Sequence, residues 1–135
     1  MLGEMVGEFK GKITGRRVLP LHEMDPKIEV SVERKGRLLG VEAMEMVTFW
    51  SIRKPGGVLY GEGQGALMSN EGEMGVYHAT GVGKSGGRGT STMLRGVLYP
   101  HSRSPKWVSL NGVALVYEYE SDENGNTHVK LWEWK

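Results

Sequence analysis

Residues 59–82 read Leu59-Tyr60-Gly61-Glu62-Gly63-Gln64-Gly65-Ala66-Leu67-Met68, then Ser69-Asn70-Glu71-Gly72-Glu73-Met74, then Gly75-Val76-Tyr77-His78-Ala79-Thr80-Gly81-Val82. Two alternating arms around a Ser-Asn-Glu-Gly turn are typical of a β-hairpin. A turn centred near Asn70-Glu71 pairs Glu62 with Thr80 and Gln64 with His78. Because side chains alternate between the two faces of a strand, the glycines share one face and these four polar residues share the other. The hairpin therefore predicts a wall on which an acid, an amide and an imidazole meet.

The segment before this hairpin supplies a marker of the inside of the sheet. Residues 27–34 alternate the apolar side chains Ile28, Val30 and Val32 with polar ones, which indicates a strand with one buried face. Lys35-Gly36 predicts a two-residue turn, since glycine supplies the positive φ that such turns need. The buried face of the returning strand then runs through Leu39, Val41, Ala43, Glu45, Val47 and Phe49. Glu45 is the anomaly, because it is a carboxylate in an otherwise apolar row.

A second turn, predicted at Pro55-Gly56, connects that row to the central hairpin. A tight turn there pairs Phe49 with Glu62 and Val47 with Gln64. Since Phe49 and Val47 belong to the apolar face, Glu62 and Gln64 are expected to point into the interior.

Strand and turn signals alternate along the rest of the chain, and no segment has the apolar period of a long helix. Further strands are predicted at residues 4–18, 90–100, 108–120 and 127–135. Asn124-Gly125 predicts a type I′ turn that groups Val113, Leu115, Tyr117 and Tyr119 with Lys130, Trp132 and Trp134. The glycine-rich turn at 85–89 leaves open whether Leu94 or Arg95 points inward. The predicted fold is all-β: one domain, residues 1–135, forming an eight-stranded antiparallel up-and-down β-barrel, with a two-sheet sandwich as the alternative.

The composition restricts the class of protein. The 21 glycines among 135 residues favour a sharply bent sheet, and the absence of cysteine excludes disulfides and thiolate metal sites and fits a reducing compartment. No apolar run approaches the roughly 18 residues of a membrane span, and the charged first ten residues do not form a signal peptide. A net charge of +1 argues against a nucleic-acid binder. We therefore expect a soluble, cytoplasmic protein with no membrane or nucleic-acid partner.

Two motifs that suggest cofactors fail their structural requirements. Gly81-Val82-Gly83-Lys84-Ser85-Gly86 matches a phosphate-binding pattern, but the residues after it predict a turn and a strand rather than the helix that would hold phosphates. The four histidines have no metal-binding spacing, although His78, Glu62 and Glu45 could assemble a metal site across strands. No cofactor and no metal are predicted.

The candidate site is the group Glu45, Glu62, Gln64 and His78. In a dry barrel, Glu62 or Glu45 would act as general base or acid, with His78 as the proton partner. The expected ligand contacts are Gln64, Tyr60, Phe49, Thr80, Arg95, Tyr117 and Trp132. Two other interpretations stay open: a self-satisfied polar plug in a filled barrel, or ordinary solvated positions if the assigned inside is the outside.

Two surface features suggest partners. The predicted register places Met44 and Met46 with Trp50 on the outer face, which favours a homo-oligomer, most simply a dimer. The loop at 101–106 carries Arg103 and Lys106 and is a candidate contact for an anionic group at the barrel mouth.

Four segments carry a resemblance to a known architecture: Gly61-Glu62-Gly63-Gln64-Gly65, Ala79-Thr80-Gly81-Val82-Gly83, Arg95-Gly96-Val97-Leu98 and Leu110-Asn111-Gly112-Val113. From Val58 onward the chain resembles the small calycin-like barrels, especially the allene-oxide-cyclase-type and dirigent-like ones, and uncharacterised bacterial proteins of that shape. The G-x-W motif of lipocalins is missing. The resemblance implies an interior cavity for a small apolar molecule, and some members steer a cyclisation.

The leading hypothesis is a barrel that holds a small, largely apolar or amphipathic ligand. The first alternative is an isomerase or cyclase that uses a buried carboxylate and His78. The second is a filled barrel with a structural or protein-interaction role. An interior void above about 300 Å³ would favour a ligand or substrate.

Overall fold

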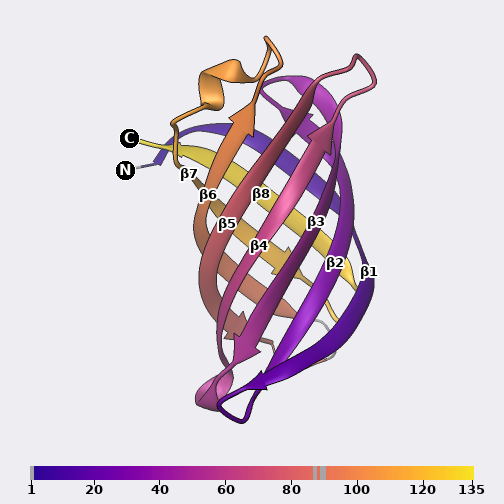
Figure 1. The fold of residues 1–135 in the computed structure, drawn as a ribbon, viewed down its shortest axis with the longest axis vertical. Helices are drawn as coiled ribbons and strands as arrows, with labels where there is room; N and C mark the ends of the chain where they lie inside the picture. The colour runs from indigo at the N-terminus through magenta and orange to yellow at the C-terminus, as the bar shows by residue number, and fades with distance from the viewer. Residues whose placement is uncertain (1, 87, 89–90) are drawn as a thin grey trace.

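The computed structural model describes residues 2–86, 88 and 91–135, and the strands in this part of the chain close into one antiparallel barrel (Figure 1). The strands are β1 (Leu2–His22), β2 (Asp25–Leu38), β3 (Val41–Arg53), β4 (Val58–Met68), β5 (Met74–Ser85), β6 (Thr92–Ser102), β7 (Leu115–Ser121) and β8 (Asn126–Trp134). Each strand pairs with the next along the chain, and β8 pairs with β1. The predicted eight-stranded up-and-down barrel is confirmed.

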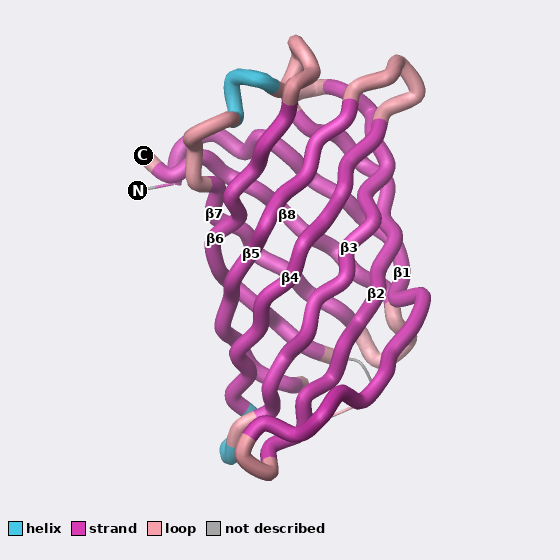
Figure 2. Tube along the Cα trace, viewed as in Figure 1, coloured by secondary structure: helices cyan, strands magenta, loops and turns pink. Residues whose placement is uncertain are grey.

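In the described residues two short 3₁₀ turns lie between strands, η1 (Pro55–Gly57) after β3 and η2 (Val108–Leu110) after β6, and Figure 2 shows them at opposite ends of the barrel. The second replaces the beginning of the strand that the sequence predicted at 108–120, because β7 starts only at Leu115. In the described residues no helix has the length and apolarity needed to cross a membrane.

The turn between β2 and β3 lies further along the chain than predicted. Strand β2 continues through Lys35-Gly36, and the chain reverses at Leu39-Gly40, where both residues have positive φ. Val32 therefore pairs with Val47 rather than with Leu39. Because this changes the partner by an even number of residues, the facing is unaffected: Val30 and Val32 are buried as expected, and Ile28 is partly buried.

The connection between β3 and β4 shows that the predicted register of β4 against β3 is wrong. Phe49 pairs with Gly63 and Trp50 pairs with Glu62, one residue away from the predicted register. The connection closes through the Lys54 N–H to Val58 C=O hydrogen bond around η1, so it is one residue longer than the tight Pro55-Gly56 turn. A one-residue slip moves every side chain of a strand to the other face.

The central hairpin consequently has the predicted register and the opposite facing. Glu62 pairs with Thr80 and Gln64 with His78, as expected, but the glycines of β4 point inward. Their lack of side chains makes room for aromatic ones: a Cβ at Gly65 would overlap the ring of Tyr77. A Cβ at position 81 would likewise overlap the Tyr117 hydroxyl. The glycine face is the lining that admits tyrosines into the barrel.

The predicted register of β7 against β8 is also wrong by one residue. Ser121 pairs with Thr127 around a three-residue connection in which Gly125 has a φ of 82°, as in a type I turn followed by a left-handed glycine. Tyr119 therefore pairs with Val129 rather than with Lys130, and Trp132 lies on the outer face. The aromatic wall predicted on β8 is wrong; the inner face of β8 is aliphatic.

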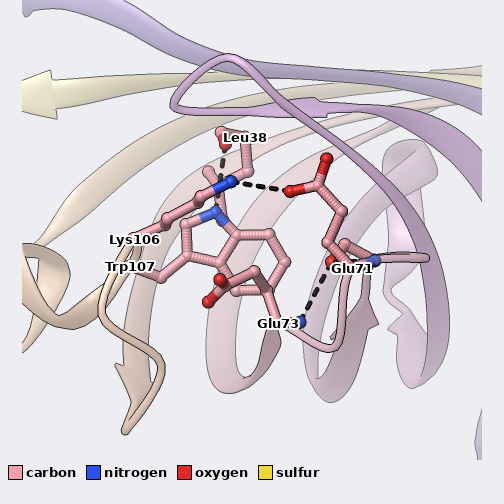
Figure 3. A network of polar contacts seen from close by, with 6 residues as sticks. Leu38, Glu71, Glu73, Lys106 and Trp107 are labelled. Atoms are coloured by element: carbon pink, nitrogen blue, oxygen red, sulfur yellow. Dashed lines mark hydrogen bonds and ion pairs between the residues drawn. The ribbon is translucent and has the colours of Figure 1, made fainter.

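The β6–β7 connection closes one end of the barrel. Trp107 and Leu110 are 1% and 3% exposed, and the Trp107 indole N–H donates to the Leu38 carbonyl at 3.1 Å. Lys106 Nζ lies 2.6 Å from Glu71 Oε2 in the β4–β5 turn (Figure 3). Lys106 was expected to contact an anion at the mouth of the barrel. It instead forms an ion pair with Glu71 at the end that Trp107 and Leu110 close.

Candidate functional site

The predicted acid–amide–imidazole wall lies on the outside of the barrel. The side chains of His78 and Glu62 are 57% and 33% exposed, with 3.9 Å between His78 Nε2 and Glu62 Oε1. Glu45, by contrast, is 1% exposed and faces the interior. The three residues therefore form neither one acid–base constellation nor a metal site, and the described residues contain no group of three or more side chains that could hold a metal ion.

Gln64 and His78 instead line an open groove of about 700 Å³ on the outer face. The other side chains of the groove include Met46, Thr48, Val76, Tyr99 and His101. Its members Met46, Val76 and Tyr99 are well exposed. Met44, which does not line the groove, is exposed as well, as the sequence predicted for this face of β3. The groove is a surface rather than an enclosed pocket.

The remaining outward residues are held in local contacts. Tyr60 packs against Trp50 with ring centroids 5.9 Å apart, and Thr80 is the cross-strand neighbour of Glu62. Arg95 Nε lies 3.6 Å from Glu118 Oε2 on the outer face. Of the two residues whose facing the sequence left open, Leu94 is therefore the one that points inward. These expected ligand contacts, with Trp132, do not reach the interior.

The interior retains Glu45, Phe49 and Tyr117 from the predicted set and adds a centre that the sequence interpretation did not include. Arg34 Nε donates to Glu45 Oε1 at 2.6 Å, and the Tyr77 hydroxyl donates to Glu45 Oε2 at 2.5 Å. The available signal for Arg34 was its place two residues after Val32 in the inward alternation of β2. The mistaken turn at Lys35-Gly36 made Arg34 a strand end instead of a core position.

The surroundings of this centre raise the pKa values of Arg34 and of the interior tyrosines. Burial opposes the charge of Arg34, but its interactions with Glu45, Tyr77 and Tyr119 together hold the pKa of Arg34 above its usual value. Burial, reinforced by the charge of Glu45, raises the pKa of Tyr77 well above its usual value. Burial also raises the pKa of Tyr117 to about 12, and the pKa of Tyr119 is raised for the same reason.

One guanidinium nitrogen of Arg34 has no hydrogen-bond partner among the described residues. Arg34 Nη1 is buried and forms no hydrogen bond within the described part of the chain, although its guanidinium carbon lies 5.3 Å from the centroid of the Tyr119 ring. Leaving a buried charged donor unpaired costs more than about 1–3 kcal/mol. Tyr117 differs, since its hydroxyl donates to the Thr80 carbonyl at 3.1 Å. Arg34 therefore offers a free donor inside the barrel.

A cavity of about 50 Å³ lies beside Arg34, lined by Glu45, Tyr77, Tyr117 and Tyr119 and by apolar side chains. A second cavity of about 40 Å³ lies toward η1, and Phe49, Leu94 and Tyr119 line both. Pockets that bind small molecules have volumes of at least about 300 Å³, whereas a volume near 50 Å³ suits one or two waters. The interior is largely filled.

The comparison with solved structures supports the fold. No family model and no curated protein matches the chain. Among solved structures, it is similar to a protein of unknown function from Clostridium acetobutylicum ATCC 824, with a TM-score of 0.81, 11% identity and 98% of each chain covered. A conserved protein of unknown function from Rhodopseudomonas palustris has a TM-score of 0.81 and 10% identity, with 98% of this chain and 97% of that one covered. The likeness is one of fold alone.

Proposed function

We propose that this barrel binds a small, largely apolar molecule in its interior and that Arg34 is the principal polar contact. The observation that carries the proposal is the buried, unpartnered Nη1 of Arg34 beside a cavity. A ligand oxygen placed there would supply the missing acceptor and remove the penalty of an unsatisfied donor. The apolar side chains of the same cavity favour a ligand whose remaining surface is hydrocarbon.

The charge balance of the centre defines the acceptor. Glu45 already neutralises Arg34 across 2.6 Å, so the cavity does not require a second negative charge. A carbonyl, ether or hydroxyl oxygen fits this donor. Both oxygens of Glu45 accept a hydrogen bond, from Arg34 and from Tyr77. We therefore assign Glu45 to positioning Arg34 rather than to the proton transfer that the isomerase alternative requires.

The size of the interior limits the ligand. A molecule of more than a few heavy atoms needs both cavities, and these are separated by the edge-to-face pair Phe49–Tyr119, with centroids 5.6 Å apart and planes at 73°. Rotation of either ring would join the two spaces. Ligand binding in the proposed site accordingly moves Phe49 or Tyr119.

A second candidate function follows from the same volumes. A barrel that is filled apart from about 50 Å³ and 40 Å³ also suits a structural or interaction module that works through its outer face. The two functions differ in whether anything enters the interior.

The decisive experiment follows interior and exterior methyl groups by NMR during titration with cyclopentanone, and with cyclopentane as the matched probe without an oxygen. We expect saturable shifts at Val47 and Leu98, which line the cavity, and none at Val82, which is 58% exposed. Cyclopentanone should bind more tightly than cyclopentane. Equal binding of the two probes would overturn the role of Arg34. No saturable shift with either, together with a native mass equal to that of the polypeptide, would leave the filled-barrel function.

An Ala79→Leu variant supplies the control. Ala79 lines the cavity, so a larger side chain there should fill it and abolish binding. Its circular dichroism must match that of the wild type for the loss to count as occlusion. Retained binding in a folded Ala79→Leu variant would place the probe elsewhere.

A further inference from the structure

We infer that the η1 end of the barrel holds an anion-binding subsite formed by Arg16, Arg53 and the Ser51 hydroxyl, and that the ligand is an amphipathic carboxylate. This inference rests on the proposed function and names the class of ligand. The three side chains line the cavity of about 40 Å³ that leads to Phe49 and Tyr119. Among the described residues that line it there is no aspartate or glutamate.

The strands turn both arginines toward this mouth for identifiable reasons. A register shift between Ile13 and Gly15 in β1 changes the facing of the strand, so that Arg16 pairs with Val30, whose side chain is buried in the core. Arg53 ends β3 in the inward alternation of Glu45, Val47 and Phe49, and Ser51 precedes it on the same face. The bulge and the strand end thus bring two guanidinium groups to one opening.

These two arginines lack the partners that arginines elsewhere on the barrel have. Arg17, Arg37 and Arg95 each form an ion pair on the outside, with Glu29, Glu42 and Glu118 respectively. Within the described residues, Arg16 and Arg53 form no ion pair and no side-chain hydrogen bond. A carboxylate can accept charge-assisted hydrogen bonds from such guanidinium groups, and bidentate ones are the strongest of this kind.

The remainder of the barrel sets the direction of the ligand. The opposite end is closed by the buried side chains of Trp107 and Leu110, so a ligand of this interior would enter at the η1 end. Beyond the arginines, the same cavity is lined by Ile28, Leu59 and Phe49, which suit a hydrocarbon body. An amphipathic carboxylate would therefore keep its charge at the mouth and extend its apolar part inward, so that a second, neutral oxygen at its far end would meet Arg34 Nη1.

The test compares hexanoate with hexan-1-ol, a pair that differs in charge at one end, by titration calorimetry and by the interior methyl shifts. Hexanoate should bind the wild type more tightly, and added salt should weaken hexanoate alone. The Arg16→Gln/Arg53→Gln variant should lose about tenfold or more in hexanoate affinity, the equivalent of one charge-assisted hydrogen bond, and keep its affinity for the alcohol. The matched control is Arg17→Gln, next to Arg16 in sequence but paired with Glu29 outside.

The outcomes separate the two proposals. If hexan-1-ol perturbs the interior methyl groups and hexanoate binds no better, or the double variant binds hexanoate as the wild type does, the anion subsite is overturned and the proposed function stands. If neither probe reaches the interior, the anion subsite is overturned, and the cyclopentanone titration alone decides the proposed function. A loss of hexanoate affinity in Arg17→Gln as large as in the double variant would place the anion on the outer face and also overturn the subsite.

Discussion

Arg34 and Glu45 occupy directly paired positions of β2 and β3, and their side chains meet inside the barrel at 2.6 Å with 4% and 1% of their surfaces exposed. Each of these buried charges would be strongly destabilising without the other, because the loss of hydration is offset only by their mutual attraction. The Tyr77 hydroxyl adds a hydrogen bond to the second carboxylate oxygen. The pair is thus both the polar centre of the proposed site and a sensitive point of the fold.

Removal of one partner should destabilise the barrel strongly. We expect Glu45→Gln to lower the free energy of unfolding by about 3–5 kcal/mol, because the charge of Arg34 then stays buried without a counter-charge. Urea denaturation measures the change. Glu62→Gln is the matched control and should stay within about 0.5 kcal/mol, since Glu62 is partly exposed on the outer face. The double replacement Arg34→Met/Glu45→Leu should cost less than Glu45→Gln; an equal or larger cost would show that the ion pair itself is worth more than we infer.

The inward facing of the glycines can be tested by adding a methyl group. Gly65→Ala should cost about 1–3 kcal/mol, because the new Cβ overlaps the Tyr77 ring and the core must repack. Gly15→Ala is the control, since a Cβ at Gly15 meets nothing within 4 Å, and it should be neutral or stabilising by up to about 1 kcal/mol. Both are measured from urea midpoints. Equal stabilities of the two variants would contradict the assigned facing.

The plug formed by Trp107 and Leu110 at the closed end of the barrel should contribute strongly to the free energy of unfolding through the Trp107 indole. Trp107→Ala should cost about 3–5 kcal/mol, as expected for a large aromatic side chain that is 1% exposed. Trp107→Phe should cost less, because it keeps most of the packing and loses mainly the hydrogen bond to the Leu38 carbonyl. Trp134→Phe, at a residue 61% exposed, is the control for thermal unfolding followed by fluorescence. A Trp107→Phe variant as unstable as Trp107→Ala would assign the plug's stability to that one hydrogen bond.

Alkaline pH should destabilise the barrel through its interior tyrosines. The pKa values of Tyr77, Tyr117 and Tyr119 are raised by burial, that of Tyr117 to about 12. Above the ordinary tyrosine pKa of about 10, the unfolded chain releases protons that the native state retains, so the free energy of unfolding falls as pH rises. Below about pH 10 these three groups contribute no pH dependence.

The measurement is urea unfolding at about pH 8 and about pH 11, on either side of the ordinary tyrosine pKa. Tyr117→Phe should lose less stability between the two pH values than the wild type, because it has one fewer phenol to ionise on unfolding. Equal losses in the two proteins would remove Tyr117 from the account.

The homo-oligomer expected from the outer face stays a prediction. Met46 is 47% exposed and Tyr99 is 53% exposed in the outer groove, a composition typical of subunit interfaces. Light scattering should return about twice the chain mass of 14.9 kDa for the wild type and the chain mass for Met46→Glu. Val18→Glu, at a position 71% exposed and outside the groove, should leave the mass unchanged. A wild-type mass of one chain would end the proposal.

The facing of the central hairpin shows how far a single sequence reaches. The pairs Glu62–Thr80 and Gln64–His78 were predicted correctly because the five-residue connection between β4 and β5 is short and its centre can be located. The site was misplaced because two other connections, around η1 and at Asn124-Gly125, differ from the assumed turns by one residue. Turn residues such as Gly56 and Gly125 permit a positive φ in several turn types, so they mark a reversal without specifying its length.

Alternation, strand number, antiparallel order and the burial of the β2 row are local properties, which residue types and spacing were sufficient to establish. Which face of β4 is enclosed is not local, because it depends on the parity of each connection and on what fills the space. Only the closed barrel reveals that glycines on β4 and β5 leave room for Tyr77 and Tyr117, and that Arg34 meets Glu45 in the core. Because side chains alternate with a period of two residues, the sequence of a strand does not specify which of its two faces is enclosed. Long-range packing decides which face that is.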